Sequence, residues 1–436
     1  MEKFKFKDRI LIGITLFSMF FGAGNLIFPP FLGAEAGKQT IPAFIGFLLS
    51  AVCLPVLGVI AVTKSGGINN IASKVHPKFA FVFIMILYLS IGPCLAIPRT
   101  ASTSFSMAVT PFWGGDKIWL IQIIYTAIFF VATSLVALHP EKLTEFLGKR
   151  LTPILLTLIL VLFIGSIIRP AGDFADAKNF YGNNAPVGGF LYGYQTMDTL
   201  AALNFGMIVA MNVREKGIKK DKSVMFETIN AGWIAGLLLF VVYGMLAFVG
   251  AVSSDKFSNV ADGTETLTNM VSFLFGKGGS ILLAVLFVIA CFNTCVGLLS
   301  CCGKYFNEIF PKVSYKSWVF IFAAFSMVVS NVGLNAILKF SVPLLNTIYP
   351  IAILLIILSC LEKFISDYRG IYVLSVTLCG VVSVISVLDQ QGIVIPFITE
   401  YAHYIPGYDL GFGWILPTVL GMIIGSFFGK TNKIKA

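Results

Sequence analysis

The chain is a succession of long hydrophobic runs separated by short polar segments. A typical run is about 20 residues long and carries few charges, which is the length that an α-helix needs to cross the hydrocarbon core of a membrane. The runs are continuous, whereas the strands of a membrane β-barrel alternate hydrophobic and polar positions over about 10 residues. The pattern therefore predicts an all-α, polytopic membrane protein.

Twelve transmembrane helices result when each run is bounded by charged or turn-forming residues. Their predicted ranges are 10–31, 41–63, 79–108, 117–138, 151–169, 188–212, 224–251, 280–302, 317–335, 340–360, 371–388 and 411–429. A polar segment, 252–279, separates the seventh span from the eighth and has room for a short surface helix. Residues 1–436 are therefore expected to form one transmembrane domain.

The composition supports a membrane protein and excludes other classes. Of the 436 residues, 57% are hydrophobic and 12% are charged, whereas soluble domains carry about 25% charged residues. The net charge of +10 does not indicate a nucleic-acid partner, because the basic residues are spread between the spans. The eight cysteines lie in or beside hydrophobic runs, so packing is expected for them rather than a disulfide framework or a metal site.

The lysines and arginines between the spans predict the orientation. With the N-terminus inside, the inner segments carry 23 basic residues and the outer segments carry 7. The short basic head Met1–Arg9 leads directly into the first span, so it is not expected to be a cleavable signal. Both termini are therefore expected in the cytoplasm.

Two spans contain interruptions near their middle. The first has two glycines and an asparagine at 22–25, and the sixth has a polar run at 195–199. An interrupted helix is tolerated in a membrane only where protein or a cavity covers the break. For the glycines of the first span, close packing between two helices is the alternative explanation.

The two interrupted spans are five apart, which predicts two inverted repeats. The repeats would comprise 10–169 and 188–360, followed by two additional helices at 371–429. At each break, free N–H groups attract a carboxylate and free carbonyls coordinate a small cation. An amino acid carries a carboxylate and Na⁺ is a small cation, so the two groups of a break suit an amino acid that is transported together with Na⁺. No organic cofactor is expected.

Charged and polar side chains within the spans are candidates for function. Asp198 has several possible roles: to bind a substrate ammonium, to neutralise a cation, to carry a proton or to cap the second half of its helix. Arg99 either pairs with a carboxylate or extends to the outer surface. Asn293 and Thr294 offer oxygens of the kind that Na⁺ prefers, or form hydrogen bonds to their own helix.

Aromatic side chains flank both breaks. Those of Phe20, Phe21, Tyr192 and Tyr194 are candidates for the walls of a pocket that takes a hydrophobic side chain.

Three strings resemble the bacterial branched-chain amino acid carriers, a family of leucine, isoleucine and valine:cation symporters also called carrier system II. They are residues 20–30 (FFGAGNLIFPP), 96–101 (AIPRTA) and 193–203 (GYQTMDTLAAL). The resemblance extends over nearly the whole chain. It implies uptake of leucine, isoleucine and valine across the bacterial cytoplasmic membrane, coupled to Na⁺.

The family is similar in plan to the 5+5 inverted-repeat amino acid transporters, and this similarity implies two sites. The substrate carboxylate would meet the backbone amides of Ala23, Gly24 and Asn25. The Na⁺ ligands of the first span would be the carbonyls of Ser18 and Phe21. Those of the eighth span would be Ala290, Asn293 and Thr294, although Asn293 stands where that plan usually has a hydroxyl residue.

The predicted substrate site therefore comprises both breaks. Its residues are Phe21, Gly22, Ala23, Gly24, Asn25, Tyr194, Gln195, Thr196 and Asp198. The hypothesis is a Na⁺-coupled symporter that works by alternating access, with a side-chain pocket lined from spans one, three, six and eight.

Three other functions are alternatives to this one. The nearest is the same fold driven by H⁺, with Asp198 as the proton carrier. An enzyme is not predicted, because the chain has no H-E-x-x-H motif, no G-x-S-x-G motif and no plausible triad. A transporter-like sensor would need an output domain, and no inner segment exceeds about 15 residues.

Overall fold

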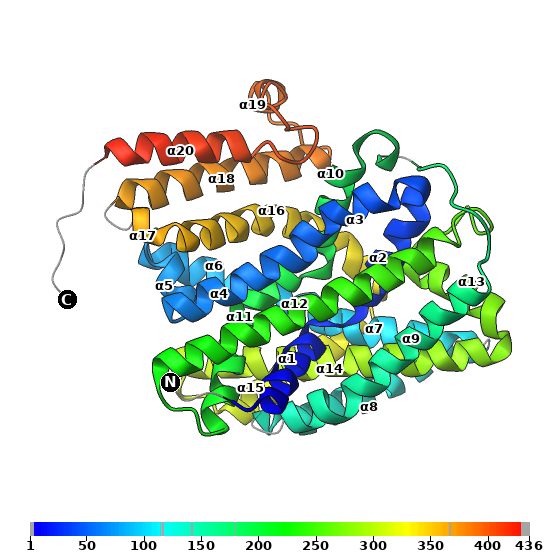
Figure 1. Ribbon diagram of the computed structural model, residues 1–436. Coiled ribbons are helices and arrows are strands. Elements are labelled where there is room, and N and C mark those ends of the chain that lie inside the picture. The colour runs from blue at the N-terminus through cyan, green and yellow to red at the C-terminus, as the bar shows by residue number, and fades with distance from the viewer. Residues whose placement is uncertain are drawn as a thin grey trace.

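The computed structural model describes residues 4–428 except 114, 116, 141, 142, 179, 366 and 367. The described residues form helices and turns and no strand, so the predicted all-α class is confirmed. Most of the long helices run between the two ends of the molecule that lie at the left and right of Figure 1.

Each of the first five predicted spans coincides with one helix or with two consecutive helices. They are α1 (Phe6–Phe20) with α2 (Ala23–Ala36), α3 (Thr40–Leu48) with α4 (Leu54–Ser65), α6 (Pro77–Leu89) with α7 (Ala96–Ala108), α8 (Ile118–Ala137), and α9 (Thr152–Ile168).

The remaining seven predicted spans coincide with helices in the same way. They are α10 (Tyr181–Gly193) with α11 (Asp198–Glu215), α12 (Asp221–Ala251), α14 (Lys277–Ile309), α15 (Tyr315–Ser330), α16 (Leu334–Cys360), α18 (Arg369–Gln390) and α20 (Ile415–Phe427). Shorter helices lie in the connections: α5 (Ile68–Ala72), α13 (Gly263–Phe275), α17 (Glu362–Ile365) and α19 (Ile398–Ala402). The helix α13 lies in the polar segment 252–279, which had room for a short helix.

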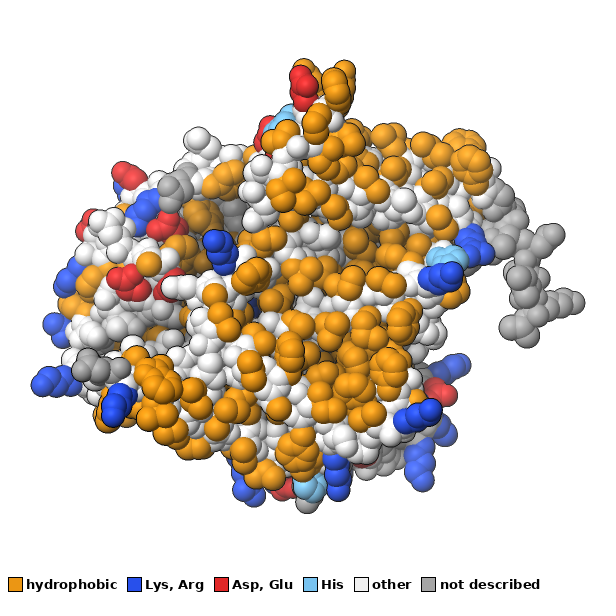
Figure 2. All heavy atoms as spheres, turned by 180° about the vertical axis from the view of Figure 1, so that it is seen from behind, with side chains coloured by type: hydrophobic (Ala, Val, Ile, Leu, Met, Phe, Trp, Pro, Cys, Tyr) orange, Lys and Arg blue, Asp and Glu red, His pale blue; other side chains and the backbone are white. Residues whose placement is uncertain are grey.

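The length and hydrophobicity of these helices make the chain an integral membrane protein. In the described part of the chain, eight helical stretches are long and hydrophobic enough to cross a membrane, or nine if a bent pair counts as one span. The helices α15 and α20 are hydrophobic but shorter. In the view of Figure 2, hydrophobic side chains cover most of the surface, and charged side chains gather toward its ends and lower edge.

Both predicted interruptions are present. Between α1 and α2, Phe21 and Gly22 have extended backbone. Between α10 and α11, a 3₁₀ turn at Tyr194–Thr196 is followed by Met197 in the left-handed region, at φ 64°, and the two helices are bent by 45°.

The third span is also interrupted, which was not predicted. Its two helices meet at a π-helical turn, Ser90–Cys94, in which Gly92 has non-helical angles and Pro93 follows it. Proline has no backbone N–H, so it cannot continue the hydrogen-bond pattern of the helix.

Glycines allow the helices α3 and α10 to cross with their backbones in contact. A Cβ atom on Gly46 would lie 1.8 Å from the carbonyl oxygen of Pro186, and one on Gly189 would lie 1.8 Å from that of Ala43. The last two long helices, α18 and α20, pack against each other and beside α16, along one side of the molecule (Figure 1).

The segments that were predicted to lie inside the cell share one end of the molecule. The helices α5 and α17 and the start of α12 lie at the left of Figure 1, whereas α13 lies at the right. Some of the basic residues behind the predicted orientation are outside the described residues, namely Lys3, Lys142, Lys430, Lys433 and Lys435. Residue 429, the last of the twelfth predicted span, is also outside them.

Candidate functional site

The first break leaves backbone groups free on both sides. In a continuous helix the amide of Gly22 would donate to the carbonyl of Ser18, but here it donates to Asn25 Oδ1 at 3.0 Å. The Ser18 carbonyl is thereby released from the helical pattern. On the other side, the amides of Ala23, Gly24 and Asn25 form the first turn of α2, where a helix offers its N–H groups no internal acceptor.

The second break is joined to the first by Arg99. This side chain on α7 is 4% exposed, and its Nη1 donates to the carbonyl of Gln195 at 3.0 Å. A Cβ atom on Gly24 would lie 2.9 Å from Arg99 Nη2, so the guanidinium adjoins the first turn of α2. Of the two alternatives for Arg99, extension to the outer surface is wrong because the side chain is buried, and its hydrogen-bond partner among the described residues is a carbonyl and not a carboxylate.

Asp198 connects the two breaks to α12. Its carboxylate is 1% exposed and accepts hydrogen bonds from Asn25 Nδ2 at 2.9 Å and from the hydroxyl of Tyr243 at 2.5 Å. Asn25 Nδ2 also contacts the Tyr243 hydroxyl. No hydrogen bond within the described residues joins this carboxylate to the amides of its own helix, so a capping role does not account for it.

Tyr243 is a site residue that the sequence did not reveal. It is fully buried in α12, where it is a lone hydroxyl group in a hydrophobic stretch. That isolated hydroxyl was the available signal, but nothing in the sequence connects it to Asp198, 45 residues away.

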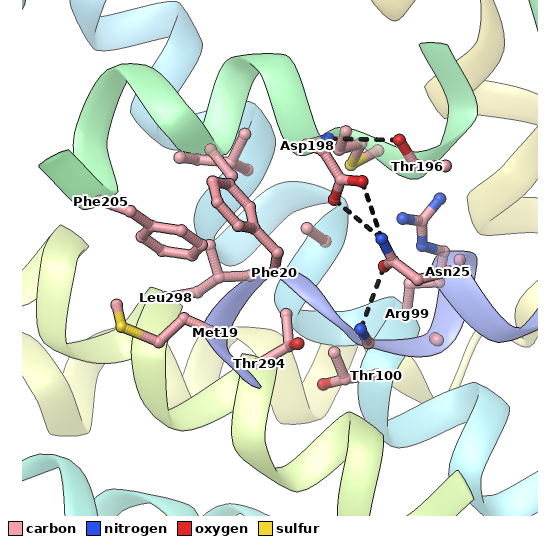
Figure 3. A pocket seen from close by; sticks show the side chains of 17 residues that line it. Met19, Phe20, Asn25, Arg99, Thr100, Thr196, Asp198, Phe205, Thr294 and Leu298 are labelled. Atoms are coloured by element: carbon pink, nitrogen blue, oxygen red, sulfur yellow. Dashed lines mark hydrogen bonds between the residues drawn. The ribbon is translucent and has the colours of Figure 1, made fainter. Parts of the chain in front are cut away.

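A cavity of about 20 Å³ lies between the two breaks. It is lined from spans one, three, six and eight, the four spans from which a side-chain pocket was expected. Figure 3 shows Asn25, Arg99, Thr196 and Asp198 around one end, and hydrophobic side chains at the other. The hydrophobic end comprises Met19, Phe20, Phe205 and Leu298. The cavity has room for about one water molecule, so it is closed to anything larger.

Most of the predicted substrate-site residues line this cavity, but three do not. Gly22, Ala23, Gly24, Asn25, Thr196 and Asp198 are in the lining. Phe21 turns away and stacks on Phe17, with ring centroids 5.1 Å apart. Tyr194 stacks on Tyr349 at 4.3 Å. Gln195 takes part through its carbonyl, which holds Arg99.

Of the four aromatic residues that were candidates for the walls, only Phe20 lines the cavity. Its ring packs against that of Phe205, with centroids 5.2 Å apart. Tyr192 packs instead on Phe28 and Phe31, to one side.

The oxygens predicted to bind Na⁺ lie on α1 and α14, which pack against each other at the first break. A Cβ atom on Gly22 would lie 2.6 Å from Thr294 Oγ1, so α14 directly adjoins the break. The side-chain oxygens of Asn293 and Thr294 are buried and have no hydrogen-bond partner among the described residues. The same holds for the hydroxyl of Ser18, whose predicted ligand is its carbonyl. Asn293 and Thr294 therefore do not bond to their own helix.

The other two predicted ligands accompany this group. Ala290 is fully buried one turn before Asn293, and Phe21 follows the last residue of α1. The last carbonyls of a helix receive no hydrogen bond from an N–H group of the same helix. The carbonyl of Phe21 is therefore available at the break.

Comparisons with known proteins agree on the kind of protein. A family model described as "Branched-chain amino acid transport protein" matches residues 5–432. The chain is 40% identical to the branched-chain amino acid permease BraB of Bacillus subtilis (strain 168), over 98% of each chain. It is also 40% identical to the permease BrnQ of the same organism, over 95% of each.

Solved structures support the fold. A Na⁺-coupled sialic acid symporter, in a substrate-bound outward-open state, superposes with a TM-score of 0.58 at 12% identity. The match covers 98% of this chain and 91% of the symporter.

Proposed function

The chain belongs to the family of branched-chain amino acid transport proteins, and on that premise we propose that it imports leucine, isoleucine and valine together with Na⁺. It is a transporter and not an enzyme, as its relatives are permeases. We place it in the bacterial cytoplasmic membrane with both termini inside. Its twelve spans form two inverted repeats, 10–169 and 188–360, with two further helices.

The observation that carries the proposal is the cavity with one polar and one hydrophobic end. The amides of Ala23–Asn25 and the guanidinium of Arg99 together suit a carboxylate. Asp198 supplies the opposite charge for an α-ammonium group. The hydrophobic end receives a branched aliphatic side chain, which has no hydrogen bonds to satisfy.

Coupling to Na⁺ is supported by the buried oxygens of the first break and α14. Side-chain oxygens of Ser18, Asn293 and Thr294 without hydrogen-bond partners are costly unless something binds them. Neutral oxygens suit a hard monovalent cation. Na⁺ bound there would hold α14 against the break and so arrange the amides that receive the substrate.

Transport proceeds by alternating access. Because the cavity is far smaller than an amino acid, substrate enters only when the helices around it rearrange. Binding of Na⁺ and substrate favours the closed arrangement, from which the site then opens inward. Selection among the three substrates is modest, because one methylene in a hydrophobic pocket contributes about 1–3 kcal/mol.

Uptake by purified protein in sealed proteoliposomes tests the proposal. Labelled leucine should accumulate under an inward Na⁺ gradient, and unlabelled isoleucine and valine should compete. A proton gradient without Na⁺ should give no accumulation. Uptake that follows protons alone would instead assign coupling to Asp198. No uptake under either gradient, in vesicles shown to be sealed, would contradict the substrate class and leave the fold unaffected.

A matched pair of variants tests the ion site. Thr294→Val keeps the shape of the side chain but removes its oxygen, so the Na⁺ concentration for half-maximal uptake should rise about tenfold. Thr157→Val makes the same change on the exposed face of α9 and should leave it unaltered. Equal Na⁺ dependence in the two variants would remove Thr294 from the site.

A further inference from the structure

A second and larger pocket lies next to the cavity, toward the end of the molecule where α5 lies. We call it the inner pocket, and its volume is about 220 Å³. It is lined by the segment 66–70, Tyr88, Asn204, Met207, Ile208, Cys301, Lys304, Tyr305 and Glu308. None of these residues lines the first cavity.

Along the helices α11 and α14, residues that line the inner pocket come three positions after residues that line the cavity. On α11, Phe205 lines the cavity and Ile208 lines the inner pocket. On α14, Leu298 lines the cavity and Cys301 lines the inner pocket. Three residues of helix rise about 4.5 Å, so the barrier between the two spaces is about one side chain thick.

The third span shows the same three-residue spacing, in the opposite chain direction. Ile91, in the π-helical turn, lines the cavity, and Tyr88, three residues earlier on α6, lines the inner pocket. The ring of Tyr88 stacks on that of Tyr305 with centroids 3.8 Å apart, which gives the pocket a flat wall. A molecule that leaves the cavity past Ile91, Phe205 and Leu298 therefore enters the inner pocket directly.

The charges of the inner pocket match those of an amino acid zwitterion. Lys304 and Glu308 are four residues apart on α14, so both side chains lie on the same face of the helix. In the described part of the chain, neither forms an ion pair. The ammonium of Lys304 has the thioether of Met211 beside it, which is a neutral neighbour.

An independent observation also indicates a ligand. Asn204 is 1% exposed and lines the inner pocket, and its Oδ1 has no hydrogen-bond partner among the described residues. Its Nδ2 donates to the carbonyl of Leu200 in its own helix, so Oδ1 is the atom of this amide that has no partner. An acceptor buried in this way is stabilised by an N–H donor such as an α-ammonium group.

We propose that the inner pocket is a second, transient binding site for the transported amino acid on its way to the cytoplasm. Lys304 receives the carboxylate, while Glu308 and Asn204 Oδ1 receive the ammonium. Met207, Ile208 and Cys301 contact the aliphatic side chain. This inference rests on the proposed function and adds a binding step that follows release from the cavity.

Equilibrium binding of labelled leucine to purified protein in detergent and saturating Na⁺ tests the inference. The wild-type chain should bind two leucines, one tightly and one weakly. Gly24→Leu blocks the first cavity and should retain only the weak site. Adding Lys304→Gln to Gly24→Leu should weaken the remaining binding at least tenfold, whereas adding Lys312→Gln should not. Lys312 is an exposed lysine near the end of α14 that does not line the inner pocket.

The outcomes separate this inference from the proposed function. One leucine per wild-type chain, together with no binding to Gly24→Leu, would overturn the inner site and leave the proposed function intact. No leucine bound to the wild-type chain would overturn both. If Gly24→Leu does not fold, Lys304→Gln alone decides, because it should reduce two bound leucines to one. An unchanged stoichiometry in Lys304→Gln would contradict the inference.

Discussion

At the scale of single residues, the site depends on a few buried groups that hold one another in place. Asn25 donates to Asp198 and accepts from the amide of Gly22, so one amide side chain stabilises the first break and connects it to the second. Arg99 completes the connection through the carbonyl of Gln195. The break is therefore held in a defined shape by these hydrogen bonds, while the backbone groups on its two sides stay free for ligands.

The first residue-scale prediction concerns Gly24, which adjoins Arg99. Replacement by leucine should reduce leucine uptake to background, because the new side chain occupies the space between the α2 amides and the guanidinium. The measurement is uptake into proteoliposomes, with elution profile and circular dichroism as checks on folding. Gly278→Leu is the control, since a Cβ atom there meets nothing within 4 Å. Wild-type uptake by Gly24→Leu would contradict the proposed substrate site.

The second concerns Tyr243, whose hydroxyl donates to Asp198. Tyr243→Phe removes a hydrogen bond to a buried carboxylate, which contributes about 1.5–3 kcal/mol. The leucine concentration for half-maximal uptake should therefore rise about tenfold or more. Tyr372→Phe makes the same change in α18, outside the cavity, and should have no such effect. Similar kinetics for the two variants would mean that Tyr243 does not position Asp198 for binding.

At the scale of helices, interruptions and close crossings have different causes. The first break uses two glycines and an asparagine, the sixth-span break uses a residue in the left-handed region, and the third-span break uses Gly92 before Pro93. The crossing of α3 and α10 depends instead on Gly46 and Gly189, which permit backbone contact within helical segments, although Asn184 of α10 has non-helical angles. Glycine therefore does not by itself identify a break.

The helix-scale prediction concerns that crossing. Gly189→Val places a side chain where the carbonyl of Ala43 lies 1.8 Å from a Cβ atom, so α3 and α10 must separate. We expect a loss of about 3 kcal/mol of stability, seen as a lower melting temperature of the purified protein in detergent. Gly244→Val is the control, because its Cβ meets only the ring of Phe44, at 3.5 Å. Equal melting temperatures would show that the backbone contact is not required.

At the scale of the whole molecule, the proposed orientation depends on the distribution of charge. The segments with most of the basic residues gather at one end, where α5 and α17 lie. The inner pocket lies toward the same end, since residues 66–70 line it. A pocket on the basic side is consistent with release into the cytoplasm under the positive-inside rule.

This orientation predicts the side from which single cysteines react. In a chain whose native cysteines are replaced by serine, Lys277→Cys should react with a membrane-impermeant thiol reagent added to intact cells. Lys216→Cys should react only after the cells are permeabilised. Both positions are exposed, so reagent access depends on the side of the membrane. The reverse pattern would invert the proposed topology and make the inner pocket an outer one.

The sequence by itself determined the features that depend on local composition. Helices follow from the length of each hydrophobic run, and each predicted span coincides with helix in the described residues, although several helices extend beyond the predicted bounds. The breaks at 22–25 and 195–199 were evident because paired glycines and a run of polar residues are unusual in the middle of a hydrophobic span. The family was evident as well, because three strings of distinctive residues carry it.

Only the tertiary structure decided which side chains meet in the cavity. Arg99 on α7 and Phe205 on α11 line it, and Tyr243 on α12 contacts Asp198 beside it. Phe21 and Tyr194, which adjoin the breaks in sequence, point away. The physical reason is that a position in the chain sets the depth of a residue in its helix, whereas the rotation of that helix against its neighbours sets the direction of the side chain. Rotation results from packing between distant segments, which no local pattern records.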